Sequence, residues 1–583
     1  MTGALNAQAL FAPADFTTAV AQTLERARHE GWMRRLWDHD ATLWTDTDEA
    51  RWLGWLGAAR GEAVDVEALD DLQTYVKTRS FRHVLLLGMG GSSLGPEVLA
   101  KTFGAAAGFP SLLILDSTDP DQIARTAAMI DPVTTVFIVA SKSGSTLEPD
   151  VLHRYFWGLT QQALGVGRAG AHFIAVTDPG SKLEATARTD GFARVFLGDP
   201  TIGGRFSILS PFGMVPAAVI GLDVRAVFAG LADMVEACGA ETEPHANPGL
   251  ILGVAIGLAA RAGRDKLTVV ASPGIDDIGA WLEQLIAEST GKQGRGIIPV
   301  DGEPLGAPSV YGDDRVFAHL RLAGGDNAAM DAAVWALQDA GCPVIRIDLA
   351  DRHGLFQEFF RWEIATAVAG VVLGVHPFDQ PDVEAAKIKT RALTDACEAT
   401  GAVTAQEPFF REGPFALFAD AANTRSLRAE AETASLQSYL GAHVRRAGAG
   451  DYLGFLAYLD RTEANIDAMT ELRTLLRDAL NLATVVGFGP RFLHSTGQAY
   501  KGGPNSGVFL QLTAQAAADL AVPGRKATFG MIEAAQARGD FDVLAERGRR
   551  VLHVDLGPDV ATGLADLVGA MRRAVASDAG GST

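Results

Sequence analysis

The chain contains very little cysteine. Only three of its 583 residues are cysteine, Cys238, Cys342 and Cys397, and no two of them form a CxxC pair. This pattern suggests a reducing compartment and argues against a metal cluster. We therefore expect no metal at the functional site.

Long apolar runs and an export signal are also missing. The longest apolar stretches, near Leu250–Leu258 and Ile364–Val375, are too short to cross a bilayer. The first residues, Met1–Leu5, lack a basic segment followed by an apolar one. The sequence therefore predicts a cytoplasmic enzyme.

Positive charge is scarce, since 50 Lys and Arg face 70 Asp and Glu and leave a formal net charge of −20. Such an acidic chain is a poor partner for nucleic acid or an anionic membrane. An anionic substrate such as a phosphate ester would need locally concentrated positive groups. Lys142 and a few arginines are the candidates.

Between residues 80 and 222, apolar strands alternate with Gly- or Ser-containing loops and helices. Near-continuous apolar runs of this kind predict a parallel sheet covered on both faces. The expected strands are Val84–Leu87, Leu112–Leu115, Val136–Ala140, His172–Thr177 and Arg194–Leu197. A second set follows at Lys266–Ala271, Ile297–Val300, Val316–Leu322 and Val344–Leu349.

We expect an α/β protein with two doubly wound α/β/α units with parallel sheets and a smaller C-terminal α/β domain. The predicted parts are a helical, Trp-rich region (1–75), a first unit (76–225), a second unit (226–400) and a C-terminal extension (401–583). Within the extension, the sequence predicts helices at Asp460–Leu482 and Met531–Arg538 and strands at Val508–Leu512 and Val551–Asp555.

A serine-rich loop, Ser141–Glu148, follows the strand Val136–Ala140 and precedes a segment that can be helical. The hydroxyls of Ser141, Ser143, Ser145 and Thr146 crowd this turn together with Lys142. Backbone N–H groups at a helix start favour an anion, and hydroxyls and a Lys suit phosphate oxygens. An ordinary helix cap, the alternative, needs only one hydroxyl.

Two glycine-containing loops are further candidates. Gly88–Pro96 follows a strand and has two glycines of a dinucleotide loop, but Ser93 occupies the third position. A phosphate or a sugar would suit it equally well. Gly203 and Gly204 precede Arg205, whose fixed fork of donors suits an anion or a developing oxyanion. A surface Arg beside a turn is the alternative.

Three titratable residues could act on a substrate. Glu288 shares a helix face with Gln284, four residues earlier, and could be a general base. The alternative is an ordinary surface pair with Lys292. His353 follows a predicted parallel strand, where open sheets bind ligands, and Lys387 lies on a short helix. A loop His and a plain helix start are the alternatives.

Taken together, these motifs resemble the glucose-6-phosphate isomerase family. The matching segments occur in family order across residues 80–390: Gly88–Pro96, Ser141–Glu148, Gly203–Ser207, Glu288–Lys292, His353 and Phe378–Lys387. The Trp-rich N-terminal region and Gly489–Gly497 resemble the isomerase half of bifunctional transaldolase/glucose-6-phosphate isomerases. The resemblance implies two sugar-isomerase (SIS) units and reversible conversion of glucose 6-phosphate into fructose 6-phosphate.

The resemblance also implies roles for individual residues. Glu288 would move a proton between C2 and C1, Arg205 would stabilise the enediolate, and His353 and Lys387 would assist ring opening. Substrate or phosphate binding would fall to Gly91, Ser92, Ser141, Lys142, Ser143, Ser145, Thr146, Glu148, Gly204 and Gln284. One shuttling carboxylate and one fixed cation suffice for this chemistry, so no cofactor is expected.

Some features fit the pattern less well. In the compact bacterial form of this family we expect Asn at the position of His376. His376 instead of His353 could therefore open the sugar ring. The segment 488–507, with Arg491, His494 and Lys501, has no assigned mechanism.

Two other functions remain open. A non-catalytic sugar-phosphate sensor would use the same loops but would not need Glu288, Arg205 and Lys387 together. A nucleotide-dependent dehydrogenase would use Gly88–Gly95 and Asp116. For the isomerase, we expect a homodimer whose sites can borrow residues across the interface.

Overall fold

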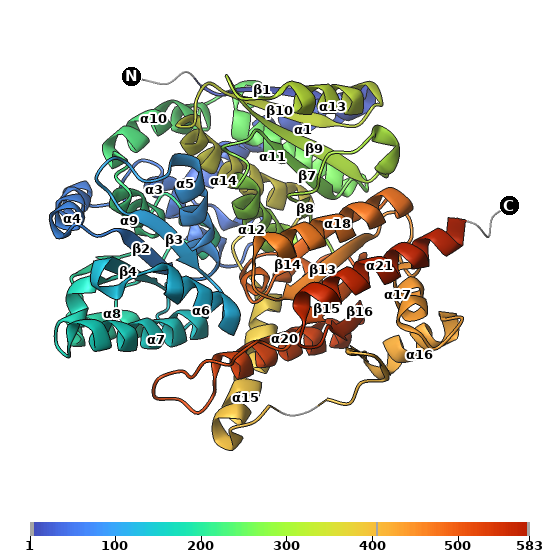
Figure 1. Cartoon of the computed structure of the whole chain (residues 1–583). Coiled ribbons are helices and arrows are strands. Elements are labelled where there is room, and N and C mark those ends of the chain that lie inside the picture. The colour runs from blue at the N-terminus through green and yellow to red at the C-terminus, as the bar shows by residue number, and fades with distance from the viewer. Residues whose placement is uncertain (1–4, 404–405, 580–583) are drawn as a thin grey trace. The chain divides into compact units, whose positions relative to one another are not determined.

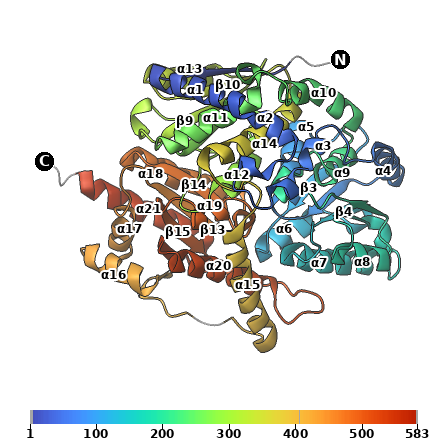
Figure 2. The same ribbon diagram turned by 180° about the vertical axis from the view of Figure 1, so that it is seen from behind.

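The computed structural model describes residues 5–403 and 406–579, and the chain divides into two compact units. Unit 1 comprises residues 1–116, 126–290 and 316–379, and unit 2 comprises residues 117–125, 291–315 and 380–583. Each unit is built from strands and helices in alternation (Figures 1 and 2). Among the helices of the described residues, none is both long enough and apolar enough to cross a membrane.

The first sheet of unit 1 is fully parallel and has the strand order β3-β2-β4-β5-β6. All five of its strands were predicted from their apolar runs, because both faces of such a sheet are buried. The strands are β2 (His83–Leu87), β3 (Ser111–Leu115), β4 (Thr135–Ala140), β5 (Phe173–Thr177) and β6 (Arg194–Leu197).

This strand order has a switch point between β2 and β4. From β2 the chain moves outward to β3, and from β4 it moves outward in the opposite direction to β5 and β6. Helix α5 (Leu94–Phe103) covers one face, while α7 (Leu147–Leu164) and α8 (Lys182–Thr189) cover the other (Figure 1). Open α/β sheets bind ligands at such a point, outside the carboxyl ends of the strands. The loops that follow β2 and β4 are the glycine loop and the serine loop.

The second sheet of unit 1 runs β1-β10-β9-β7. Its strands are β1 (Ala7–Phe11), β7 (Lys266–Ala271), β9 (Arg315–Leu322) and β10 (Val344–Leu349). β10 and β9 are parallel, but β1 lies antiparallel along the outer side of β10. The expectation of an entirely helical N-terminal region is therefore wrong for residues 7–11, because this edge strand is specified by its distant partner β10.

The two apolar runs that are too short for a bilayer form the central helix pair of unit 1, α11 (Pro248–Arg261) and α14 (Gly354–Leu373). Gly249, Gly253 and Gly257 recur every four residues on the contact face of α11. A Cβ at Gly253 would lie 2.4 Å from the carbonyl oxygen of Ala365, so glycine permits the close approach.

The other helices of unit 1 include the predicted N-terminal ones. Their bounds are α1 (Ala14–Glu30), α2 (Trp32–Trp37), α3 (Trp55–Ala58), α4 (Val66–Arg79), α9 (Pro211–Val219), α10 (Val224–Ala237), α12 (Ile278–Thr290) and α13 (Ala328–Asp339). Helix α6 (Pro120–Met129) begins in unit 2 and ends in unit 1.

Unit 2 contains a six-stranded sheet in the order β11-β12-β16-β15-β13-β14. β16, β15, β13 and β14 are parallel, and β12 and β11 extend the sheet antiparallel. β15 (Gly507–Thr513) and β16 (Arg550–Asp555) were predicted, whereas β11 (Phe410–Glu412), β12 (Phe415–Phe418), β13 (Tyr452–Tyr458) and β14 (Ala483–Phe488) were not. The short strand β8 (Ile298–Val300) also belongs to this unit.

Helices cover both faces of this sheet. Those of unit 2 are α15 (Pro381–Thr400), α16 (Ala421–Glu430), α17 (Leu436–Val444), α18 (Glu463–Leu480), α19 (Gly497–Gly502), α20 (Phe529–Glu546) and α21 (Val560–Ala579). α18 packs with α21, and α20 packs with α15 on the opposite face (Figures 1 and 2). The core between the sheet and α17, α18 and α21 is apolar.

A buried ion pair connects α19 to α20 in unit 2. Lys501 Nζ lies 2.5 Å from Asp540 Oδ1, and the two side chains are 1% and 0% exposed. Lys501, which the sequence left without a role, therefore acts in the packing of this unit. Removing one partner of such a pair leaves an uncompensated buried charge.

We predict that Lys501→Met lowers the free energy of unfolding by about 3–5 kcal/mol. Replacing both partners, as Lys501→Met with Asp540→Leu, should recover most of this loss because no charge is then buried alone. Lys389→Met is the control, since its pair with Glu546 is exposed and worth about 1 kcal/mol or less. Urea unfolding measures all three variants. A Lys501→Met loss no larger than that of Lys389→Met would contradict the prediction.

Candidate active site

Arg205 is the centre of the polar network in unit 1. It lies in a 3₁₀ turn, Gly204–Phe206, and is 2% exposed. Its Nε donates to Ser289 Oγ at 2.7 Å, and its Nη2 donates to the carbonyl oxygens of Pro377 and Asp379 at 2.7 and 2.9 Å. Burial lowers the pKa of Arg205, while Glu288 and Asp379 act in the opposite sense. Arginine starts from a pKa so high that the group stays charged.

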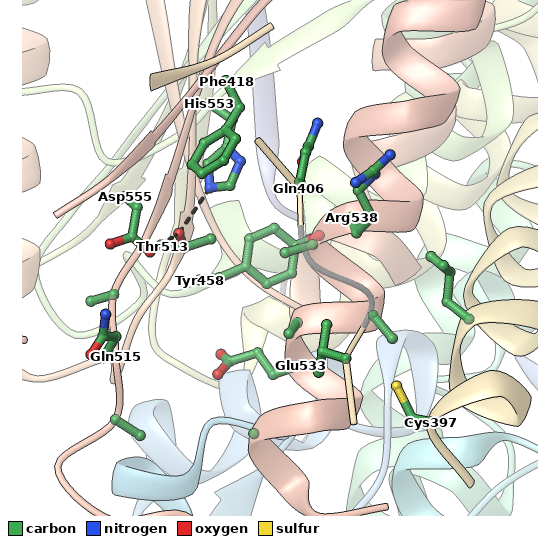
Figure 3. Close-up of a pocket in the computed structure, with 18 of the residues that line it drawn as sticks. Cys397, Gln406, Phe418, Tyr458, Thr513, Gln515, Glu533, Arg538, His553 and Asp555 are labelled. Atoms are coloured by element: carbon green, nitrogen blue, oxygen red, sulfur yellow. Dashed lines mark hydrogen bonds between the residues drawn. The ribbon is translucent and has the colours of Figure 1, made fainter. Parts of the chain in front are cut away.

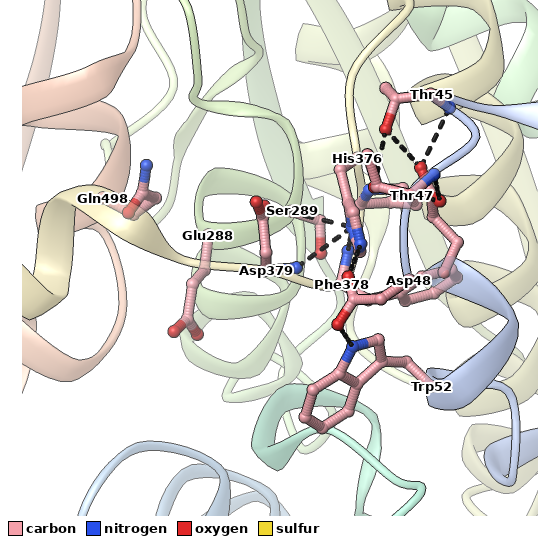
Figure 4. Close-up of polar contacts among 12 residues, drawn as sticks. Thr45, Thr47, Asp48, Trp52, Glu288, Ser289, His376, Phe378, Asp379 and Gln498 are labelled. Carbon is pink, nitrogen blue, oxygen red and sulfur yellow. Dashed lines mark hydrogen bonds and ion pairs between the residues drawn. The ribbon is translucent and has the colours of Figure 1, made fainter. Parts of the chain in front are cut away.

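Glu288 is on α12 and is labelled in Figure 4. It lies beside the Arg205 cation. Its Oε1 is 3.5 Å from Arg205 Nη1, and its Oε2 accepts a hydrogen bond from Gln284 Nε2 at 3.1 Å. The residue is 8% exposed, which contradicts the alternative of a solvated surface carboxylate. A carboxylate held beside a fixed cation and sheltered from water has the properties of a general base next to an oxyanion site.

The glycine loop touches the Arg205 turn directly. A Cβ placed on Gly91 would lie 1.9 Å from the carbonyl oxygen of Gly204, so only glycine allows this approach. At Gly204 itself, a Cβ would meet open space. Ser92 is buried beside this contact. The loop after β2 and the turn that carries Arg205 thus form one surface.

The nucleotide alternative is not supported by the same loop. Ser93, which replaces the third glycine, donates from Oγ to Asp116 Oδ2 at 2.9 Å. Asp116 is the acid that would have to bind a ribose, and it is 2% exposed. The carboxylate therefore belongs to the loop's internal hydrogen bonding.

The serine loop joins β4 to the start of α7, at the switch point of the first sheet. Ser143 and Ser145 are exposed and their hydroxyls lie 2.9 Å apart. Ser141 is buried and donates to Thr146 Oγ1 at 3.2 Å, and Glu148 is buried in the first helical turn. Gly144 has φ of +63°, so the tight loop needs glycine there.

The sequence led us to expect Lys142 to be a free cation that attracts the phosphate, but its charge is already paired. Its Nζ donates to Asp178 Oδ1 at 2.8 Å and to the carbonyl oxygen of Asp199 at 3.1 Å. The Asp178 carboxylate already balances its charge. Hydroxyls and the N-terminus of α7 are therefore the groups that this loop presents to an anion.

The two histidines occupy very different settings. The side chain of His353 is 72% exposed at the start of α14, with its ring centroid 5.3 Å from that of Phe103. His376 is 5% exposed, and its Nδ1 accepts from the backbone N–H of Phe378 and Asp379 at 3.0 and 3.2 Å. Because Nδ1 accepts, Nε2 carries the proton and donates to Asp48 Oδ1 at 2.9 Å (Figure 4).

His376 therefore shapes the turn 376–379 whose carbonyl groups bind Arg205. The contact also affects Asp48. Burial would raise the pKa of Asp48, but hydrogen bonds from Trp52 and His376 lower it overall. With both ring nitrogens engaged, His376 is a positioning residue.

Lys387 lies in unit 2, on α15, where its Nζ is 3.7 Å from Glu384 Oε2. No motif in the sequence points to the residue that binds the start of this helix. Gln498 Oε1 accepts from the backbone N–H of Asp382 and Val383 at 2.9 and 3.1 Å, and its Nε2 donates to Asp382 Oδ2 at 2.6 Å. Only its position in the Gly- and Ser-rich segment 488–507 could have drawn attention to it.

The described part of the chain contains no group of three or more His, Cys, Asp or Glu that could hold a metal ion. What unit 1 does bring together is a buried carboxylate, a buried cation and two loops at a switch point. These are the groups that an enzyme of the sugar-phosphate isomerase class requires.

Comparison with known proteins identifies the family. The phosphoglucose isomerase family model matches residues 73–301. The glucose-6-phosphate isomerase of Rubrobacter xylanophilus is 31% identical over 374 residues, which cover 56% of this chain and 86% of that protein. That of Parabacteroides distasonis is 28% identical over 389 residues, 58% of this chain and 86% of that one. This chain therefore belongs to the glucose-6-phosphate isomerase family.

A solved structure supports the fold. The crystal structure of a hypothetical protein from Thermus thermophilus is 25% identical, with a TM-score of 0.55, and the match covers 66% of this chain and 99% of that one. Part of this chain lies outside each of these alignments.

We predict that His376→Asn keeps most of the isomerase turnover, whereas His376→Ala lowers kcat by roughly tenfold to a hundredfold. An Asn side-chain oxygen can accept the same two backbone N–H groups, and an Ala cannot. Steady-state kinetics of the two variants measures the difference. If His376 opened the sugar ring, Asn would be as damaging as Ala.

Proposed function

We propose that this chain interconverts glucose 6-phosphate and fructose 6-phosphate through a cis-enediolate, with Glu288 moving the proton between C2 and C1. The observation that carries this proposal is the buried pair of Glu288 and Arg205 in a chain of this family. The reaction requires one base that serves two adjacent carbons, and a single sheltered carboxylate meets that need.

Arg205 would stabilise the charge that appears when Glu288 takes the proton. As the substrate oxygen becomes an enediolate oxygen, negative charge moves from the carboxylate to the sugar. A guanidinium already fixed by Ser289 and two carbonyl groups needs no reorganisation at that moment. Gln284 would hold the carboxylate in the orientation that reaches both carbons.

The phosphate would be held at the switch point of the first sheet. The hydroxyls of Ser141, Ser143, Ser145 and Thr146 and the start of α7 offer donors there, and Ser92 adds another from the loop after β2. The remaining substrate-binding assignments, Gly91, Lys142, Glu148 and Gly204, lie in the same loops. Lys142 would act through Asp178 and the loop backbone, since its charge is already paired.

Ring opening would use His353 and Lys387. The exposure of His353 supports a role in the site of a second subunit, because a mostly exposed imidazole is accessible to a partner chain. We therefore propose a homodimer in which each chain supplies His353 to the other. No metal or cofactor enters this mechanism.

Three further proposals rest on the sequence. The chain resembles the isomerase half of bifunctional transaldolase/glucose-6-phosphate isomerases, its parts divide near residues 75, 225 and 400, and it works in the cytoplasm. A non-catalytic sugar-phosphate sensor is the alternative function. Retention of Glu288 and Arg205 as a buried pair favours the enzyme, because a sensor would have no use for a sheltered base.

We predict that the purified chain forms glucose 6-phosphate from fructose 6-phosphate in a dehydrogenase-coupled assay. Glu288→Gln should lower kcat by about 10²–10⁴-fold, because an amide cannot take the proton. The amide keeps the shape and the hydrogen bond to Gln284, so binding of fructose 6-phosphate should change little. Glu288→Asp is the matched control. It keeps the negative charge on a shorter side chain, so its kcat should lie between those of the wild type and Glu288→Gln. Wild-type turnover in Glu288→Gln would place the base elsewhere.

We predict that two inactive variants, His353→Gln and Glu288→Gln, restore activity when their subunits are exchanged. If His353 serves the partner's site, each mixed dimer has one intact site, and an equal mixture regains about a quarter of wild-type activity. Arg205→Lys mixed with Glu288→Gln is the control and should regain nothing, because both residues belong to one site. Absence of recovery in the first mixture would show that His353 acts within its own chain.

A further inference from the structure

Unit 2 contains a second pocket, separate from the groups assigned to the isomerase. A cavity of about 540 Å³ lies at one edge of the six-stranded sheet. Its walls include Tyr458, Thr513 and Asp555, which are the last residues of β13, β15 and β16. Phe418 from β12 and Glu533 from α20 also line the cavity, and Figure 3 labels all five residues. The volume is in the range that small-molecule sites occupy.

The position of this cavity is the one where doubly wound sheets bind ligands. The chain runs outward from β13 to β14 and, on the other side, from β15 to β16. The switch point therefore lies between β13 and β15, whose final residues Tyr458 and Thr513 line the cavity. Crevices outside the carboxyl ends of strands at such points are the general binding sites of open α/β sheets.

One carboxyl oxygen in the wall has no hydrogen-bond partner among the described residues. This atom, Oε1 of Glu533, is buried. The other acids of the wall are satisfied: Asp519 accepts from the backbone N–H of Leu520 and Gly530, and Asp555 accepts from Gly557 N and Thr513 Oγ1. A buried polar group without a partner is costly, so a ligand that pairs with Glu533 would offset that cost.

The charge around Glu533 is negative. Burial raises the pKa of Glu533 well above its usual value, and Asp119, Asp121, Asp519 and Asp460 raise it further. A cation beside Glu533 would instead hold the carboxyl group ionised. A phosphate or carboxylate placed there would be repelled by the ionised acids nearby.

The basic groups of the wall do not offset this charge. Arg538 Nε donates to Asp542 Oδ1 at 2.7 Å. Burial lowers the pKa of His553 to about 3, so the imidazole is neutral. Its Nε2 donates to Thr513 Oγ1 at 2.8 Å, and its ring stacks on Phe418 with centroids 4.8 Å apart. The wall thus combines an unpaired carboxyl group with aromatic and aliphatic surface.

We propose that this cavity binds a small organic ammonium ion with an apolar or aromatic body, whose charged group pairs with Glu533. The body would lie against Tyr458, Phe418 and the alanines of α20, among them Ala534 and Ala535. Ring faces add to the attraction of an ammonium group. The backbone of Gly489 packs closely against the ring of Tyr458. A Cβ at Gly489 would lie only 2.5 Å from that ring. The proposal does not depend on the isomerase reaction.

Probes of matched size and different charge test this site on the full chain. Tryptamine, tryptophol and indole-3-acetate share one ring system and carry an ammonium, a hydroxyl and a carboxylate, and 2-phenylethylamine supplies a smaller ammonium ion. Isothermal titration calorimetry should show one ammonium probe binding at least tenfold more tightly than the alcohol and the acid. Equal or tighter binding of the alcohol or the acid, or no binding of either amine, would overturn the proposal.

Variants locate the binding. Glu533→Gln keeps the shape of the side chain and removes its charge, so the preference for the ammonium probe should be lost. Glu546→Gln makes the same change outside the cavity on the same helix, and Glu288→Gln makes it at the isomerase base; both should bind as the wild type does. Ala534→Phe, which fills the cavity, should abolish binding of every probe and covers the case in which Glu533→Gln does not fold. An unchanged preference in Glu533→Gln, or unchanged binding in Ala534→Phe, would contradict the site.

Discussion

The buried guanidinium of Arg205 is the constraint on which the candidate active site depends. A charge taken out of water must be paired and hydrogen-bonded, and Arg205 meets this requirement through Ser289, Pro377, Asp379 and Glu288. These partners come from α12 and from the turn that follows α14. One cation thereby contacts Glu288, the helix that carries it and the turn shaped by His376. The same charge is then available to a developing oxyanion without further movement.

Much of this arrangement could be predicted from the sequence because its signals are local. The five strands of the first sheet are apolar runs, and Gln284 and Glu288 share a helix face by spacing alone. The apolar runs 250–258 and 364–375 could be excluded as membrane spans, and they form the α11–α14 pair. Residues implied by family resemblance, such as His353 and Lys387, could be located but not given roles by geometry in one chain.

What escaped prediction depends on partners distant in sequence. β1 is an edge strand specified by β10, more than 300 residues later, and the pairing of Lys142 with Asp178 could not be read from the serine loop. Gln498 binds the start of α15 across 116 residues. In each of these cases the deciding contact is tertiary. β13 and β14, by contrast, are apolar runs like the predicted strands, and they were not predicted.

Each unit has a candidate binding site at the switch point of one of its sheets. In the first sheet the switch point lies between β2 and β4 and is occupied by phosphate-type loops; in the six-stranded sheet it lies between β13 and β15 and is lined by aromatic rings and an unpaired carboxyl group. The same topology therefore presents opposite electrostatic preferences, hydroxyls and a helix start in one sheet and acids in the other. This contrast would allow an acidic chain to bind a phosphate ester at the first site and an ammonium ion at the proposed second one.

The central claim is that Glu288 moves a proton between adjacent carbons of a sugar phosphate. Proton NMR of fructose 6-phosphate incubated with the chain in D₂O tests it most directly. The account predicts deuterium at C1 of fructose 6-phosphate and at C2 of the glucose 6-phosphate formed, and incorporation about 10²–10⁴-fold slower with Glu288→Gln. Formation of glucose 6-phosphate without any solvent deuterium, or equal incorporation in the Gln variant, would contradict it.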